Sequence, residues 1–210
     1  MEFKILGPFE VSNERGAVAL GGAKSRVVLA VLLLNANKPV SAERLAQALW
    51  GEDAPPGAVK AVQVHVSRLR KALGDGDVVE TTSAGYRLRV DPGELDAEHF
   101  EHLVEDGRHA LAAGHPEQAA IVLREALMLW RGSPLPELAF EPFAQAEIAR
   151  LDEQRLAAVE ARVEADLAAG RSGRAPASAA RPGARGLHRR ASRAGRRDRR
   201  RAGTRAPSPA

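Results

Sequence analysis

The residues most able to do chemistry lie between positions 58 and 73, in the segment AVKAVQVHVSRLRKAL. Its lysines and arginines can pair with phosphates, and an arginine can also donate two parallel hydrogen bonds to O6 and N7 of a guanine. No acidic residue interrupts them. The segment is therefore the candidate for contacts with a polyanion, and its candidate contact residues are Lys60, Gln63, Val64, His65, Ser67, Arg68, Arg70 and Lys71.

The spacing of residues in this segment predicts a helix with two different faces. At about 100° per residue the apolar side chains share one narrow sector, and they are Val62, Val66, Leu69 and Leu73. Arg68, on the opposite face, is the best candidate for a guanine edge. Phosphates are the expected targets of Lys60, His65, Ser67, Arg70 and Lys71. Because basic residues on a helix often form no more than a solvated surface, the neighbouring elements must decide between the two interpretations.

Those neighbours favour a binding unit of three helices and a hairpin. Residues 27–34 form an apolar run that is too short to cross a bilayer and fits a buried helix. Residues 39–50 predict a second helix with Ser41 as its N-cap. Residues 78–90 form two β-prone runs around a Ser83-Ala84-Gly85 turn. This order predicts a winged helix, in which one helix enters the major groove and the hairpin reaches the backbone or the minor groove.

Charge divides the chain into three segments, although the formal net charge is only +4. Residues 1–92 contain 12 Lys and Arg and 10 Asp and Glu, residues 93–170 contain 6 and 16, and residues 171–210 contain 13 and 1. Such asymmetry predicts three segments with different partners. The absence of cysteine fits a reducing cytoplasm, where we expect the protein, and the N-terminus has no signal-peptide pattern.

The acidic middle segment, residues 93–170, is expected to form an all-α domain of the tetratricopeptide type. Two helical patterns separated by Gly114-His115-Pro116 have small residues where antiparallel helices would cross. A third helix is expected from about Phe143 to Ala169. Its apolar residues are expected to serve packing rather than ligand binding, and they are Ile148, Leu151, Leu156, Val159, Val163 and Leu167.

The last segment, residues 171–210, is expected to be a disordered basic tail. Leu187 is its only large aliphatic residue, so it cannot form a core. It is either a cationic arm that adds nonspecific phosphate contacts or the product of a reading frame that shifted near residues 170–172. The second interpretation would leave the helical domain truncated.

The first two segments together resemble SARP-type antibiotic regulatory proteins of actinobacteria. The resemblance to an OmpR-type winged helix is carried by MEFKILGPFEV, AVALGG, AKSRVVLAVLLLNANKPVSAERLAQALWG, VQVHVSRLRKALG and TTSAGYRL. LDAEHFEHL and EPFAQAEIARLDEQRLAAVEARVEADLAAGR resemble the bacterial transcriptional activator domain that follows it in this family. The resemblance covers residues 1–170.

This resemblance implies a sequence-specific transcriptional regulator, an activator of an antibiotic biosynthetic gene cluster. The implied partners are double-stranded DNA with a direct-repeat operator, RNA polymerase holoenzyme and further copies of the chain on DNA; no membrane partner is expected. In the family's wing an arginine three residues before the Gly-Tyr pair reaches the minor groove, but Thr82 occupies that position here. Arg87 is the substitute candidate for the minor groove, and Thr81 and Thr82 are further candidate contacts on the wing.

Two other functions stay open at this point. The chain could be a helical-repeat module whose winged helix binds protein, or a nonspecific nucleic-acid binder driven by its arginine tail. An enzyme is not expected, because no nucleophile, general base or paired carboxylates occur in a recognisable motif. No cofactor or metal is expected either, since His99 and His102 lack the spacing of a zinc-binding helix.

Overall fold

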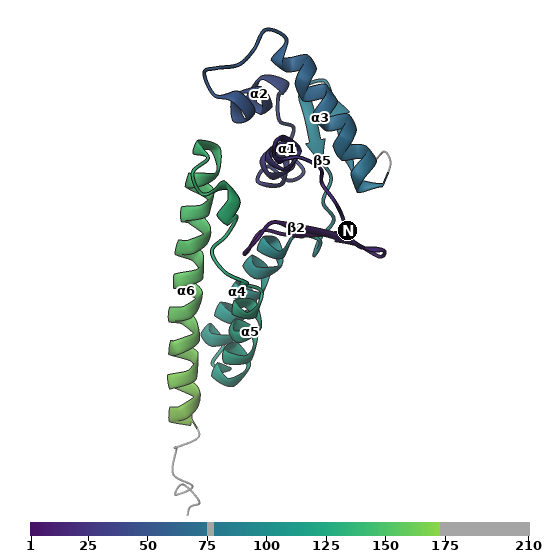
Figure 1. The fold of residues 1–210 in the computed structure, drawn as a ribbon. Helices are drawn as coiled ribbons and strands as arrows, with labels where there is room; N and C mark the ends of the chain where they lie inside the picture. Colours follow the sequence, from purple (N-terminus) through teal and green to yellow (C-terminus); the bar gives the residue numbers. More distant parts are fainter. Residues whose placement is uncertain (75–77, 173–210) are drawn as a thin grey trace, which may run out of the picture. The chain divides into compact units, whose positions relative to one another are not determined.

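The computed structural model describes residues 1–74 and 78–172, without the side chains of residues 171 and 172. The expectations for the basic tail therefore lie outside the described residues. In chain order the elements are β1 (Glu2–Lys4), β2 (Glu10–Asn13), β3 (Gly16–Ala17), α1 (Ala23–Leu33), α2 (Ala42–Trp50), α3 (Ala58–Leu73), β4 (Val79–Thr82), β5 (Gly85–Leu88), α4 (Asp96–Ala112), α5 (Pro116–Met128), the short 3-10 helix η1 (Pro136–Leu138) and α6 (Pro142–Ser172), as drawn in Figure 1.

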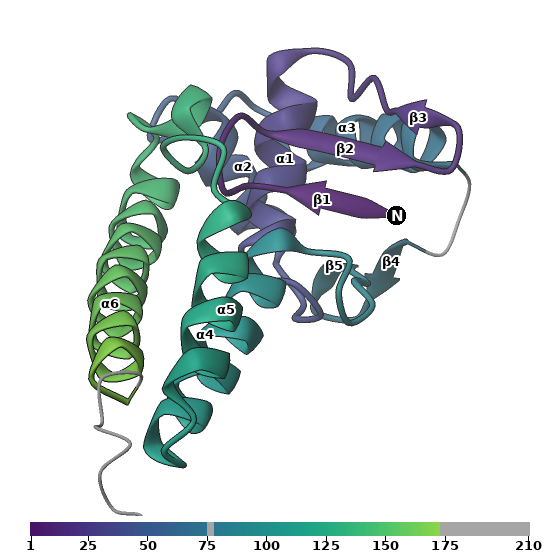
Figure 2. The same ribbon diagram turned by 90° about the horizontal axis from the view of Figure 1, so that it is seen from below.

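The N-terminal sheet is an antiparallel meander in the order β1-β2-β3. The segment MEFKILGPFEV contains two strands, because the chain reverses around Gly7-Pro8 and Phe3 then pairs with Val11. Gly7 is needed at this reversal, since a Cβ there would lie 2.8 Å from the Cβ of Arg131. Figure 2 shows β1 and β2 side by side.

The winged helix predicted from the sequence is confirmed. All three helices and the hairpin form, and the hydroxyl of Ser41 caps α2 by accepting a hydrogen bond from the amide of Arg44 at 3.1 Å. The hairpin β4–β5 is extended by Val40, whose amide donates to the carbonyl of Tyr86 at 2.7 Å while the Tyr86 amide donates back at 2.8 Å. The loop before α2 is thereby fixed to the wing.

The acidic segment forms the expected helical domain. Helices α4 and α5 cross closely at Gly107, because a Cβ at that position would meet the side chain of Leu123 at 2.5 Å. Helix α6 lies beside α5 in both ribbon views, with Ala158 and Ala165 fully buried on its inner side.

The expectation that the apolar residues of α6 all serve packing was wrong for three of them. Leu151 is fully buried, and Ile148 and Val159 are half-buried. Leu156, Val163 and Leu167 are instead exposed by 60%, 46% and 61%. Helix α6 packs through one face only, and no element within the described residues covers its outer face.

The two domains share one continuous core. It extends from Phe3 and Leu29 of the winged helix through Phe100 of α4 to Trp130 and Leu151. The backbone is paired across the junction as well: the Phe3 amide donates to the carbonyl of Glu94 at 2.7 Å, and the Arg131 amide donates to that of Leu6 at 2.8 Å.

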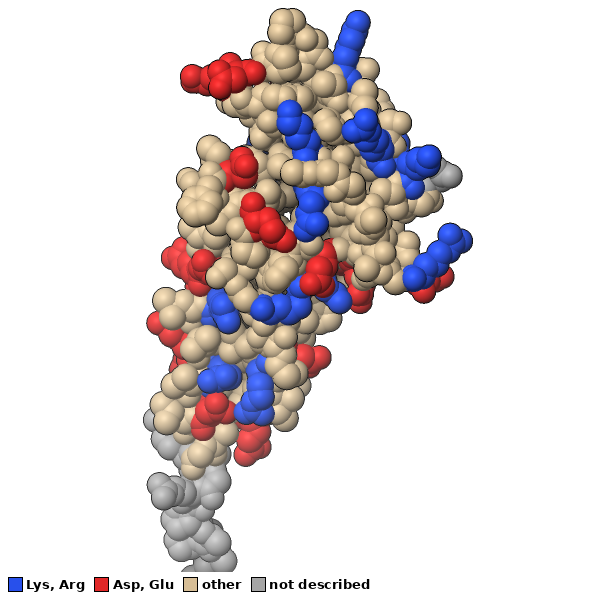
Figure 3. All heavy atoms as spheres, in the orientation of Figure 1, with Lys and Arg blue, Asp and Glu red and all other residues tan. Residues whose placement is uncertain are grey.

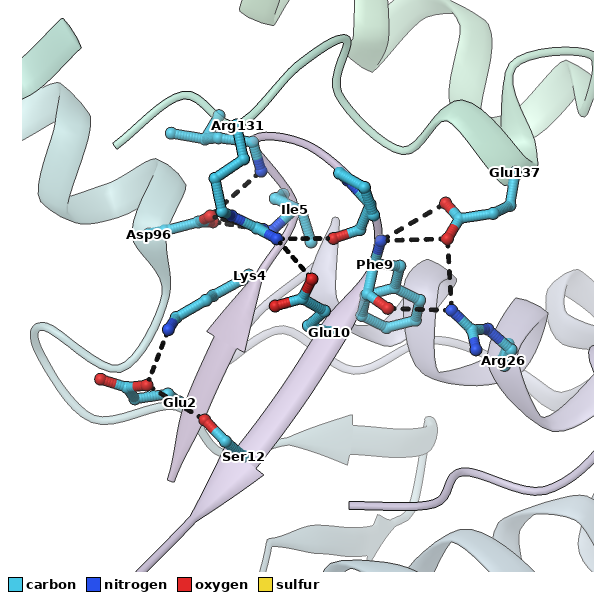
Figure 4. Close-up of polar contacts among 12 residues, drawn as sticks. Glu2, Lys4, Ile5, Phe9, Glu10, Ser12, Arg26, Asp96, Arg131 and Glu137 are labelled. Carbon is cyan, nitrogen blue, oxygen red and sulfur yellow. Dashed lines mark hydrogen bonds and ion pairs between the residues drawn. The ribbon is translucent and has the colours of Figure 1, made fainter. Parts of the chain in front are cut away.

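Charged side chains complete this junction (Figure 4). The carboxylate of Asp96 accepts hydrogen bonds from the amides of Ile5 and Leu6 at 2.8 and 3.1 Å and lies 3.5 Å from the Arg131 guanidinium. The carboxylate of Glu137 accepts a hydrogen bond from the Phe9 amide and pairs with Arg26 of α1 at 3.3 Å. Polar groups of each domain thus form hydrogen bonds and ion pairs with groups of the other domain.

Candidate nucleic-acid interface

Helix α3 is held by the core along one face. The apolar residues of the predicted stripe are all buried, with Val62 and Leu69 fully so. Glycines in the left-handed conformation delimit the helix: Gly57 precedes it with φ +85°, and Gly74 ends it with φ +94°. Only glycine adopts these angles cheaply, so both ends are sharply defined.

The other face of α3 is open to solvent and uniformly uncharged or cationic. Six of the eight sequence-predicted contact residues on this helix are exposed, namely Lys60, Gln63, Val64, Ser67, Arg68 and Lys71. Within the described part of the chain, neither Lys60, Arg68 nor Lys71 forms an ion pair. Figure 3 shows basic side chains gathered on the side where α3 runs. The surface therefore offers unneutralised positive charge on a rigid element.

Arg70, by contrast, is engaged within the protein. Its Nε donates to the carbonyl of Val79 at 2.7 Å, and its guanidinium donates to the hydroxyl of Thr81 at 2.8 Å. These bonds fix the end of α3 to the first strand of the wing. Two predicted contact residues, Arg70 and Thr81, thus pair with each other and set the position of the wing.

The wing is a tight hairpin shaped by Thr82. Its hydroxyl accepts a hydrogen bond from the Ala84 amide and donates to the Gly85 carbonyl, both at 3.3 Å. Gly85 has φ +130°, and a Cβ there would lie only 2.1 Å from the carbonyl oxygen of Val40. Any larger residue would push the wing away from the loop before α2.

Arg87, the substitute candidate for the minor groove, is neutralised on the wing. It lies directly across the hairpin from Glu80, and its guanidinium donates two hydrogen bonds to one oxygen of that carboxylate. Arg87 would have to leave this partner in order to reach a groove.

His65 lies at the half-buried edge of α3. Its Nδ1 is 3.4 Å from the hydroxyl of Ser25, and its ring centroid is 6.5 Å from that of Trp50. Burial, together with the nearby charges of Arg68 and Lys24, lowers the pKa of His65, so the free protein holds this imidazole neutral near pH 7.

Two residues beside His65 were missed from the sequence. The ammonium of Lys24 stands 4.5 Å from the centroid of the Trp50 ring. This contact joins the start of α1 to the end of α2, and the Trp50 ring lies next to His65 of α3. Lys24 thereby adds a positive charge near the edge of α3. No sequence signal joined them, because residues 24, 50 and 65 come from three different helices.

No set of three or more His, Asp or Glu side chains gathers as a metal site among the described residues. None of the described helices combines the length and apolar character needed to cross a membrane.

Two family models match the chain. Residues 17–88 match the C-terminal domain of transcriptional regulatory proteins, and residues 95–201 match the bacterial transcriptional activator domain. Both matches are to regulatory rather than catalytic families. The second match extends beyond the described residues into the basic segment.

Individual relatives agree with these models. The transcriptional regulatory protein EmbR of Mycobacterium tuberculosis is 38% identical over 181 residues, which cover 82% of this chain and 46% of EmbR. The regulatory protein DnrI of Streptomyces peucetius is 35% identical over 181 residues, covering 81% and 66%, and AfsR of Streptomyces coelicolor is 38% identical over 168 residues, covering 80% and 17%. The chain thus spans about half of EmbR and less than two thirds of DnrI.

A solved structure is similar in fold as well as in sequence. It is that of M. tuberculosis EmbR in complex with a low-affinity phosphopeptide, with a TM-score of 0.77 and 37% identity over 82% of this chain and 47% of that one. This chain has a winged helix followed by a bacterial transcriptional activator domain, and it is similar to these regulators over 80 to 82% of its length. The chain belongs to the SARP-type family of transcriptional regulators.

Proposed function

We propose that this protein binds double-stranded DNA sequence-specifically through α3 and regulates transcription. The observation that carries the proposal is the exposed face of α3, which contains Lys60, Arg68 and Lys71 without an acidic neighbour on the helix and without an ion-pair partner among the described residues. Each cation that meets a phosphate releases condensed counterions, which favours binding. Because the core already holds α3, its backbone does not have to be ordered when these side chains meet DNA.

The side chains on this face divide into base-reading and phosphate-binding groups. Arg68 lies near the middle of the exposed face beside Val64, whose methyl groups suit the C5 methyl of thymine. Lys60 and Lys71 lie toward the two ends of the helix, as positions for the flanking phosphates. Gln63 and Ser67 complete the face. Arg70 acts here by holding the wing, with Thr81 and Thr82, so that the hairpin can approach the neighbouring backbone.

The regulatory role goes further than DNA binding. We assign the protein to the cytoplasm as an activator of a secondary-metabolite biosynthetic gene cluster, acting from a direct-repeat operator as more than one copy and through contact with RNA polymerase holoenzyme. Family membership and the presence of a helical domain fused to the winged helix support this assignment. DNA contact alone does not require the helical domain, which in this proposal supplies the surface for the protein contacts.

The test compares two single variants of the full chain on an operator selected from random duplexes. Arg68→Ala should weaken operator binding by about 1 to 3 kcal/mol and relax base preference at one position per half-site. Lys71→Ala should weaken binding to all duplexes alike and lower the salt slope by about one unit. Fluorescence anisotropy at several salt concentrations measures both. Equal losses on operator and random DNA for the two variants would contradict this division of roles.

A further inference from the structure

A groove lies between the winged helix and the start of α6, on a side that the DNA-binding proposal does not use. It has a volume of about 990 Å³. One wall comes from α1 and α2, and the other comes from the first turns of α6. The floor includes the partly buried side chains of Leu34, Ala48 and Phe143. The groove is therefore apolar at its base and belongs to both domains at once.

The rim of this groove is acidic. Glu43, Glu52, Glu141 and Glu147 line it, against a single cation, Arg44. Glu147 is paired with Arg150, but in the described part of the chain none of the other three carboxylates has an ion-pair partner. Figure 3 shows acidic side chains on the side where α2 and the nearby end of α6 lie, away from the basic side chains over α3. A nucleic acid would be repelled here.

An exposed aromatic side chain, that of Phe140, lies next to the groove in the sequence. Phe140 is 93% exposed and directly precedes the lining residues Glu141, Pro142 and Phe143. An aromatic ring so fully in water gains from burial against a partner, and such rings are frequent anchors of protein interfaces.

We propose that this groove is a docking site for a protein segment with apolar residues on one face and arginines or lysines along its edges. The apolar face would pack on Leu34, Ala48 and Phe143 and bury the ring of Phe140, while the basic edges would pair with Glu43, Glu52 and Glu141. Charge complementarity selects such a segment over DNA and over an acidic peptide. A segment bound in the groove would contact both the winged helix and α6, and it would therefore stabilise their present arrangement.

The test uses the full chain and a defined probe, a fluorescein-labelled 18-residue helical peptide with leucines on one face and arginines on its flanks. Phe140→Ser and Ala146→Arg, both at exposed positions, should each weaken peptide binding about tenfold or more. Glu141→Lys should weaken it several-fold. Leu156→Ser and Glu160→Lys are the matched controls, because they change an exposed apolar and an exposed acidic residue elsewhere on α6, and they should change binding less than twofold.

Three results would overturn the proposal. The peptide could bind equally well when glutamates replace its arginines, or the control variants could weaken binding as much as the groove variants. Sedimentation could also show a dimer that Phe140→Ser abolishes, which would assign the groove to a second copy of the chain. Binding to DNA, measured separately, should not change in Phe140→Ser, so a failure here is distinguishable from a failure of the proposed DNA contact.

Discussion

At the scale of single residues, pairing within the protein separates the side chains that shape the surface from those that can meet a ligand. Arg68 and Arg70 are only two positions apart, yet the guanidinium of Arg70 donates hydrogen bonds to Val79 and Thr81, whereas Arg68 has no ion-pair partner among the residues that the structure describes. Arg87 likewise forms a hydrogen-bonded ion pair with Glu80. The sequence identifies arginines as candidate contacts on α3 and the wing, but it cannot show which of them form hydrogen bonds within the protein.

His65 gives the DNA-binding surface an expected pH dependence. In the free protein its pKa is lowered, mainly by burial. A phosphate beside the ring would favour the imidazolium, so binding would take up a proton and affinity should rise as pH falls. We expect operator affinity to increase about two- to fivefold from pH 8 to pH 6 at constant ionic strength. Fluorescence anisotropy titrations at the two pH values measure this.

A comparison of two histidine variants isolates the effect. His65→Gln should remove most of the pH dependence, whereas His102→Gln, an exposed position on α4, should preserve it. An unchanged pH profile in His65→Gln would mean that the ring does not approach a phosphate.

At the scale of elements, the helices followed from the sequence because each signal was local. The stripe of α3, the Ser41 cap and the glycines around residues 57 and 74 all act within a few residues. The exposure of Leu156, Val163 and Leu167 on α6 could not be predicted from the sequence, since these residues have the spacing of buried ones. Periodicity predicts that a face is apolar, but only the neighbouring elements determine whether it is covered.

The wing depends on one glycine, and this gives a stability prediction. In Gly85→Ala the new Cβ would meet the backbone of Val40 and Ser41, which cannot move without breaking the Val40–Tyr86 pairing. We expect a loss of about 2 kcal/mol or more from the free energy of unfolding, measured by urea denaturation. Gly114→Ala is the control, because Gly114 also has positive φ but no atom lies within 4 Å of the added Cβ. Similar losses in both variants would exclude a role for the Val40 contact.

At the scale of the whole molecule, charge is distributed so that the chain's two basic parts flank an acidic one. Residues 171–210 have 13 arginines and one acid. Deleting them should strongly lower affinity for nonspecific DNA at low salt and flatten its salt dependence. The ratio of operator to nonspecific affinity should rise, because the deletion removes contacts that read no sequence. Gel-shift titrations on both duplexes provide the measurement, and loss of operator discrimination would show that this segment reads DNA.

The junction between the domains is the part of the fold that the sequence could least predict. Asp96 lies about 90 residues along the chain from Ile5 and Leu6, and its carboxylate accepts hydrogen bonds from their amides. Glu137 lies more than 100 residues from its partners Phe9 and Arg26. No local pattern signals such pairs. They are also the reason to expect that the described part of the molecule unfolds as one unit, since the domains share both a core and hydrogen bonds.

The two tryptophans allow this expectation to be tested, because Trp50 lies in the winged helix and Trp130 in the helical domain. Trp50→Phe and Trp130→Phe each leave a single fluorescent reporter in one domain. The two variants should show denaturation midpoints that shift together when Asp96→Ala is added. That change leaves the buried amides of Ile5 and Leu6 without acceptors, which costs roughly 2 to 4 kcal/mol. If only the Trp130 reporter moved, or if the two reporters gave separate transitions, the domains would fold independently and Asp96 would stabilise one of them alone.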